Sequence, residues 1–203
     1  MLSSSEARSA LACLLLAGAL GCASTVTDRS FPALDERSGP ILRIAVAPFG
    51  AKPEAAVAST GVVARQLTEA LVERGVEVVP PEDVERAIAG RGGAVGPNAL
   101  AALVKDQFGA DALVLGEITR WVEREGGAAG TLQPASVGVR VELFGAPDGQ
   151  QLWQGEFDHT QQAMSENVLL TPRYPGGGTR WLTAEEFAQF AASELAAAFP
   201  LGP

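Results

Sequence analysis

An apolar segment, a helix and a second apolar segment follow one another in this chain, and together they limit its fold more than any other feature. Residues 41–49 read ILRIAVAPF, a nearly continuous apolar run that is typical of a strand covered on both faces. Residues 55–74 repeat apolar side chains along one helical stripe, and Gly75 is suited to end that helix. Residues 76–79 form a short second strand. Because a helix connects the two strands, we expect them to pair in parallel.

The remaining patterns predict three more helices and three more strands. They are a short helix that opens at 80–83, a helix at 97–108, strands within 111–125, 136–144 and 151–159, and a last helix with a capping box formed by Thr183 and Glu186. The three strands follow one another with turn signals between them, as in an antiparallel meander. The sequence therefore predicts an α/β (α+β) fold in the order β-α-β-α-α-β-β-β-α, with a single mixed sheet of about five strands and helices packed on it.

The first 22 residues have the layout of an export signal. Arg8 precedes the apolar run 11–20, and small residues follow around Cys22. A helix that spans a membrane needs about 20 apolar residues, so this run is too short. The ending resembles a bacterial lipoprotein signal, in which the cysteine is lipidated and becomes the first residue. The alternative is cleavage near Ala19 or Ala23, which would release an unlipidated periplasmic protein.

We therefore expect a lipoprotein signal peptide at 1–21, a flexible tether at 22–40 and a single periplasmic domain at 41–203. The tether is expected because residues 23–40 are polar, contain two prolines and show no apolar period. Cys13 lies in the signal peptide and Cys22 is the lipidation site, so the domain has no disulfide and no thiol nucleophile. The formal net charge of -9 argues against nucleic acid and anionic headgroups as general partners.

One long segment without a sustained period attracts attention as a binding region. Residues 161–181 carry Arg173, Tyr174, Arg180 and Trp181 around three consecutive glycines, and arginine and aromatic side chains on such a loop often anchor protein interfaces. The alternative is that Trp181 packs over the sheet edge before Thr183. Further along the same patch we place Arg120, Trp121 and Arg124, at the far end of the strand within 111–125.

The sequence contains few residues suited to catalysis, metal binding or phosphate binding. His159 is the only histidine and follows Asp158, but neither Ser136 nor Ser165 stands in a nucleophile motif beside it. One histidine without cysteine ligands predicts no metal site. The glycine-rich stretches do not have the spacing of phosphate-binding loops, so they indicate turns. We expect no catalytic residues and no cofactor.

Four segments in order carry a resemblance to a known group of proteins: RIAVAPF at 43–49, GVEVV at 75–79, GADALVLG at 109–116, and the hairpin VELF followed by GQQLW at 149–153. They resemble the superfamily of the curli secretion channel lipoprotein, the penicillin-binding-protein activator lipoproteins and the amino-terminal domain of the Tol translocation protein. The resemblance covers about 42–157 and the last helix. It implies a periplasmic binding or assembly domain without catalysis. Ala23 after the cysteine resembles lipoproteins that are sent to the outer membrane.

Three functions follow as hypotheses. The first is a non-enzymatic lipoprotein of the outer membrane, facing the periplasm of a Gram-negative bacterium, that binds an envelope protein in secretion or peptidoglycan machinery. The second is a periplasmic carrier of a small or lipidic ligand, which would need a sizeable apolar cavity between sheet and helices. The third is a ring-forming secretion component, so self-association stays open.

Overall fold

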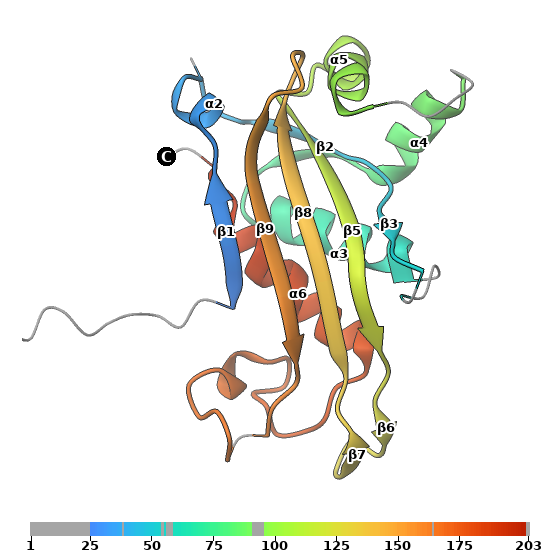
Figure 1. Cartoon of the computed structure of the whole chain (residues 1–203), viewed down its shortest axis with the longest axis vertical. Coiled ribbons are helices and arrows are strands. Elements are labelled where there is room, and N and C mark those ends of the chain that lie inside the picture. The colour runs from blue at the N-terminus through green and yellow to red at the C-terminus, as the bar shows by residue number, and fades with distance from the viewer. Residues whose placement is uncertain are drawn as a thin grey trace, which may run out of the picture.

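The computed structural model describes residues 25–37, 39–53, 55, 59–90, 96–163 and 165–201. In these residues the main sheet has seven strands, in the order β1-β9-β8-β5-β2-β4, with β3 paired to β5 (Figure 1). The strands are β1 (Val26–Ser30), β2 (Arg43–Val46), β3 (Gly50–Ala51), β4 (Glu77–Val79), β5 (Ala112–Val122), β8 (Ser136–Gly145) and β9 (Gln151–Thr160). A separate hairpin joins β6 (Glu125–Gly126) and β7 (Thr131–Gln133). The helices are α2 (Pro32–Asp35), α3 (Ser59–Glu73), α4 (Pro81–Ala89), α5 (Pro97–Phe108), the 3-10 turn η1 (Thr171–Arg173) and α6 (Ala184–Ala198).

The predicted parallel pairing of the first strands and the predicted antiparallel meander are both confirmed. The strand β2 pairs in parallel with β4 on one side and with β5 on the other, as the helical connections require. From β5 onward the sheet continues as the antiparallel meander β5-β8-β9. Gly109 ends α5 in the left-handed conformation, with a φ of 66°, and Thr183 and Glu186 form the capping box of α6.

Two apolar cores lie on opposite faces of the sheet. The first core joins α3 and α6 to the face that carries Ile44, Val114 and Phe157. The second core is smaller and joins α4 and α5 to the other face of β2 and β5, through Ala45 and Leu113. The alternation of Ile44 with Ala45 between the two cores explains why residues 41–49 are almost entirely apolar, since this strand is covered on both sides.

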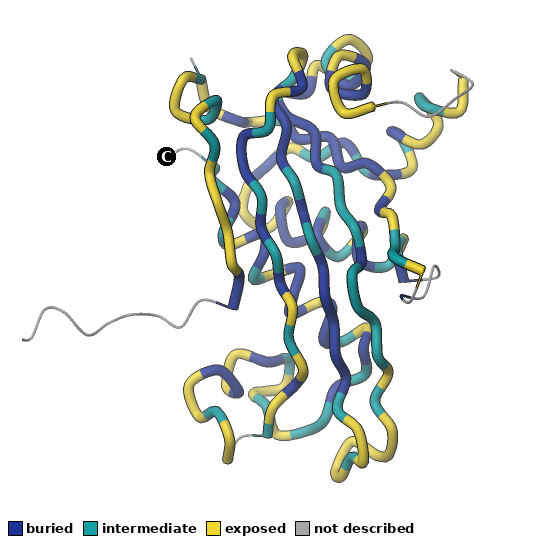
Figure 2. Tube along the Cα trace, viewed as in Figure 1, coloured by how far each residue is buried: buried dark blue, intermediate teal, exposed yellow. Residues whose placement is uncertain are grey.

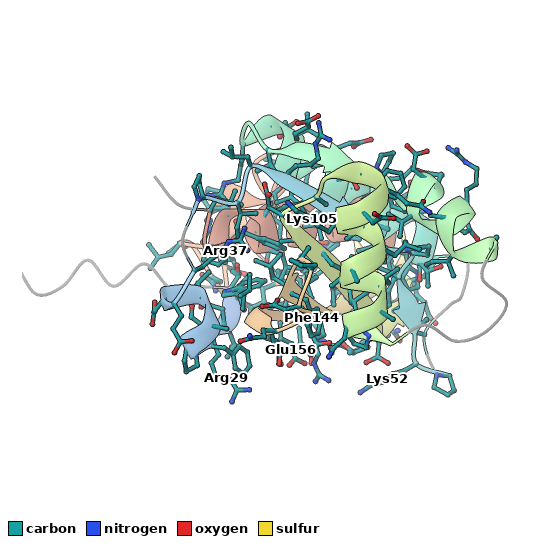
Figure 3. The ribbon with its side chains drawn as sticks, turned by 90° about the horizontal axis from the view of Figure 1, so that it is seen from above. Arg29, Arg37, Lys52, Lys105, Phe144 and Glu156 are labelled. Atoms are coloured by element: carbon teal, nitrogen blue, oxygen red, sulfur yellow. The ribbon has the colours of Figure 1, made fainter. Side chains whose placement is uncertain are left out.

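Helices leave part of the sheet uncovered. In Figure 1, α3 and α6 lie behind the sheet, while α4 and α5 stay at the end where β8 and β9 are connected. The near face of β8, β9 and β1 therefore carries no helix over most of its length. Figure 3 shows Arg29 and Glu156 pointing outward on this face, whereas Phe144 lies inside, toward α5. Phe144 belongs to the second core.

The prediction of a flexible tether over 22–40 is wrong for the segment from Val26 to Asp35, which forms β1 and α2. The strand β1 pairs antiparallel with β9 along all of its five residues, from Val26 opposite Phe157 to Ser30 opposite Trp153. The reason is tertiary: β9 would otherwise be an unpaired edge, and β1 satisfies its backbone groups. Asp28 also accepts a hydrogen bond of 3.0 Å from the buried Trp153 indole. Cys22 and the expected signal peptide lie outside the described residues.

Among the helices that the structure describes, none combines the length and the apolar character needed to cross a membrane.

Candidate functional site

Except for Arg120, the predicted binding residues lie at one end of the molecule, which we call the loop end. It consists of residues 161–163 and 165–183 between β9 and α6, the hairpin β6-β7, and residues 121–124 at and just after the end of β5 (Figure 1). The two connections touch, because the backbone N–H of Trp181 donates to the carbonyl of Ala128 at 2.9 Å. A shallow cavity of about 100 Å³ lies between them.

Tyr174 is part of the core and not of the surface. Its ring is 2% exposed and meets Phe187 and Phe190 edge to face, with centroids 5.5 and 5.0 Å away. Burial raises the pKa of the Tyr174 hydroxyl. Leu170 and Thr171 are buried beside it. The loop is therefore attached to α6 by its middle, and Tyr174 cannot contact a partner in this conformation.

Arg173 connects the loop to the beginning of β1. Its guanidinium binds Oε2 of Glu194 on α6, and the hydroxyl of Thr25 donates to the same oxygen. The side chain of Glu194 is 13% exposed, so this three-residue contact is mostly shielded from water. Arg173 thus holds the loop, α6 and the first described residue together.

Arg180 is occupied by the capping box of α6. Its two terminal nitrogens donate to the two oxygens of Glu186, at 2.7 and 2.8 Å. Glu186 also accepts from the backbone N–H of Thr183 at 2.9 Å. The Arg180 guanidinium and these N–H groups hold the pKa of Glu186 at about 2, below its ordinary 4.5. The buried side chain of Gln161 bonds to the backbone on both sides of Trp181.

The end of β5 packs against the start of α6 through Glu123. One oxygen of this carboxylate accepts from the Trp121 indole at 3.2 Å and the other from the backbone N–H of Ala184 at 3.1 Å. Arg124 donates to the carbonyl of Trp181 at 2.5 Å. The structure therefore brings Trp121, Arg124 and the backbone of Trp181 together, and the side chain of Trp181 is half-buried.

Arg120 belongs to a different surface, the uncovered side of the sheet, which we call the open face. Its polar members are Thr27, Arg29, Glu117, Arg120, Arg140, Glu142, Gln154, Glu156 and Asp158. Arg120 pairs with Asp158 at 2.5 Å, and Arg140 pairs with Glu156 at 3.4 Å. The alternation in 136–144 could have revealed this face, since Arg140 and Glu142 point away from the valines. The alternation alone does not indicate whether a helix covers Arg140 and Glu142.

A cavity of about 330 Å³ opens on the open face beside β3. It is lined by Gly50, Leu115, Gly116, Glu117, Arg140 and Glu142. The Nε atoms of Arg140 and Arg120 are buried and have no hydrogen-bond partner among the described residues.

Two of the residues weighed for catalysis, His159 and Ser136, have structural partners. The His159 ring nitrogen Nε2 lies 2.7 Å from the carbonyl of Thr25, at the contact between β9 and β1. Ser136 is buried and its hydroxyl bonds to that of Thr160 at 2.8 Å. Within the described ranges, no group of three or more acidic, cysteine or histidine side chains is placed to hold a metal ion. The space between the sheet and the helices α3 and α6, where a carrier would hold its ligand, is filled by large buried side chains such as Trp153, Phe157 and Phe187.

No protein-family model matches the sequence, and no curated protein matches it either. Several solved structures resemble the fold at a distance. The lipoprotein GNA1162 from Neisseria meningitidis is 21% identical over 64% of this chain and 91% of its own, with a TM-score of 0.46. A PelC dodecamer from Paraburkholderia phytofirmans is 18% identical over 83% and 96%, with a TM-score of 0.40. The LpoB C-terminal domain from Escherichia coli is 14% identical over 64% and 94%, with a TM-score of 0.42. Likeness at this level establishes neither a family nor a function for the chain.

Proposed function

We propose that this chain is a non-enzymatic lipoprotein, attached through Cys22 to the periplasmic side of the outer membrane, that binds another protein of the cell envelope through its open face. The attachment is supported by the signal-like run 11–22 and by Ala23 after the cysteine. The proposed binding of an envelope protein is supported by the resemblance of residues 42–157 to periplasmic binding and assembly domains.

The main support for the proposal is that no helix covers most of the open face and that this face carries charges of both signs. Along one row, Glu117, Arg140 and Glu156 lie side by side on three neighbouring strands. A surface with both signs interleaved does not suit a polyanion, whereas it suits a protein with a complementary arrangement of charges. Arginine is enriched in protein interfaces, and the cavity beside Arg140 offers room for a partner side chain.

The residues predicted from the sequence divide between two roles. Arg120 stays in the proposed interface, because it lies on the open face. Trp121, Arg180 and Trp181 are partly exposed at the loop end and can form the border of that interface. Arg173 acts within the molecule, and Tyr174 is excluded from the interface by its burial.

Site-specific photocrosslinking tests the interface. A photoreactive side chain in place of Gln154, in the middle of the open face, should crosslink one defined envelope protein in living cells. The same group in place of Glu69, exposed on α3 at the back of the sheet, is the matched control. Arg140→Glu should reduce the yield at position 154 several-fold, because it reverses a charge in the row. Equal yields at 154 and 69, or no effect of Arg140→Glu, would contradict the proposal.

The attachment is tested separately by the mass of the mature amino terminus. We expect a chain that begins at Cys22 and carries acyl groups on that residue. Cys22→Ser should then leave the chain unprocessed or unacylated and shift it out of the membrane fraction. A mature chain without acyl groups would show that the alternative, a released periplasmic protein, is correct.

A further inference from the structure

The loop end displays apolar side chains that the fold does not bury. Five large apolar side chains are exposed in the described part of the chain, and three of them belong to this end: Leu132 at 89%, Val168 at 67% and Leu169 at 79%. Leu132 lies on β7, and the other two are neighbours in the loop between β9 and η1 (Figures 1 and 2). Val168 and Leu169 are adjacent in the chain and both exposed, and an exposed apolar patch of this kind marks a contact surface more often than a single exposed side chain does.

The fold holds Val168 and Leu169 out in a defined turn. Asn167 closes this turn, because its side-chain oxygen accepts from the N–H of Leu170 at 3.0 Å and its carbonyl accepts from the N–H of Thr171 at 3.1 Å. The next two residues are fixed in the core, with Leu170 at 8% and Thr171 at 0% exposure. The turn is thus ordered before it meets any partner, so little conformational entropy is lost on contact.

The first described residue, Thr25, lies beside the loop that carries this turn. Thr25 and Arg173 share one oxygen of Glu194, which places the first described residue against the loop that carries Val168 and Leu169. Only Ala23 and Ser24 separate Thr25 from Cys22. Three residue steps reach at most about 11 Å, even when fully extended. Acyl chains on Cys22 therefore start close to the loop end and far from α4 and α5.

We infer that Val168 and Leu169 insert into the lipid surface next to the acylated Cys22. This inference rests on the proposed attachment at Cys22. The contact is apolar: the net charge of -9 disfavours attraction to anionic lipids, and the nearby Arg173 and Arg180 are already paired with Glu194 and Glu186. A second membrane contact beside a lipid anchor fixes the orientation of the domain. The end with α4 and α5 then points away from the membrane, and the open face stays accessible from the side.

A single fluorescent label tests the inference in the acylated full-length lipoprotein. Because Cys22 is acylated and Cys13 is removed, Leu169→Cys supplies the only free thiol for an environment-sensitive dye. Val72→Cys is the matched control, since Val72 is an exposed apolar residue at the far end of α3. Both proteins are placed in vesicles of neutral phosphatidylcholine that contain a nitroxide-labelled lipid. We expect quenching several-fold stronger at position 169 than at 72, unchanged at high salt and reduced by Val168→Ser.

The possible results distinguish a failure of the inference from a failure of the proposed attachment. Acylated protein that floats with the vesicles but shows equal quenching at 169 and 72 overturns the inference and leaves the attachment standing. Protection of the dye at 169 that appears only after envelope proteins are added also overturns it, since the loop would then bind a protein. A chain without acyl groups removes the attachment and the inference together.

Discussion

The arginines of the loop end illustrate how residues typical of interfaces can be used inside a fold. Arg180 forms a bidentate ion pair with Glu186, and Arg173 binds Glu194. Both acids lie on α6, so the loop is fixed to the helix that follows it. Any partner that used these two guanidinium groups would first have to displace a carboxylate.

Replacing Glu186 by glutamine should lower the free energy of unfolding by about 1 kcal/mol at neutral pH, because the charge that pairs with Arg180 is lost while the capping oxygen remains. The pKa of Glu186 is about 2 in the folded chain against 4.5 ordinarily. A lowered pKa stabilises the fold above the unfolded value, so the difference between the wild type and Glu186→Gln should shrink as pH falls from about 4.5 toward 2. Urea unfolding at a series of pH values measures this.

Glu185→Gln is the control for that experiment. Glu185 lies in the same first turn of α6 and feels the same helix dipole, but it is not paired with Arg180. We expect a smaller loss. An equal loss from both substitutions would mean that the Arg180 ion pair contributes nothing to stability.

The burial of Tyr174 could not be predicted from the sequence. The sequence presents this tyrosine between Arg173 and Pro175, in a segment without apolar period, which is the usual setting of an exposed loop residue. Its contacts with Phe187 and Phe190 depend on a loop that folds back onto α6, and no local pattern encodes that return. The sequence predicts Arg120 at the end of its strand, but its pairing with Asp158 across the open face depends on the register of the three strands β5, β8 and β9.

Helices and strands with a clear apolar periodicity can be predicted from the sequence. Strands that form only because they pair with a free edge of the sheet cannot. The strands β2, β5, β8 and β9 and the helices α3, α5 and α6 follow from apolar spacing and from capping residues. The strand β1 reads VTDRS, and four of its five residues are exposed. It becomes a strand because β9 offers a free edge, which is a property of the assembled sheet. The same holds for the two-residue strand β3, which pairs with β5.

Asp28→Ala should weaken the seam between β1 and β9. The substitution leaves the Trp153 indole N–H, which is buried, without its acceptor, and this costs about 1–3 kcal/mol of unfolding free energy. Denaturant unfolding followed by tryptophan fluorescence measures the loss, and limited proteolysis should cut β1 earlier in the variant. Asp28→Asn keeps an acceptor oxygen and is expected to lose less. If alanine and asparagine behave alike, the hydrogen bond is not what holds β1.

The two cores share their central strands, and this governs how the domain unfolds. Neighbouring residues of β2 and β5 alternate between the first and the second core, as Val114 and Leu113 do. Neither core can be exposed without disturbing a strand that supports the other. The domain should therefore unfold in one cooperative transition.

Two matched substitutions test that expectation. Leu67→Ala on α3 empties part of the first core and Leu103→Ala on α5 part of the second, and both leucines are 1% exposed. Each should cost about 2–5 kcal/mol and lower the midpoint of the same single transition. Calorimetry and far-ultraviolet circular dichroism give the transitions. A separate early transition in Leu103→Ala alone would show that α4 and α5 melt independently.

The antiparallel pairing of β1 with β9 has a mechanical consequence. A pull on the chain ahead of Thr25 would act along the axis of β1, while Thr25 itself is held by Glu194 and His159. Force in that direction shears all five residue pairs of the seam at once instead of opening them one after another. If the domain is anchored to a membrane at its amino terminus and bound to a fixed partner elsewhere, this geometry would resist the separation of β1 from β9 under force.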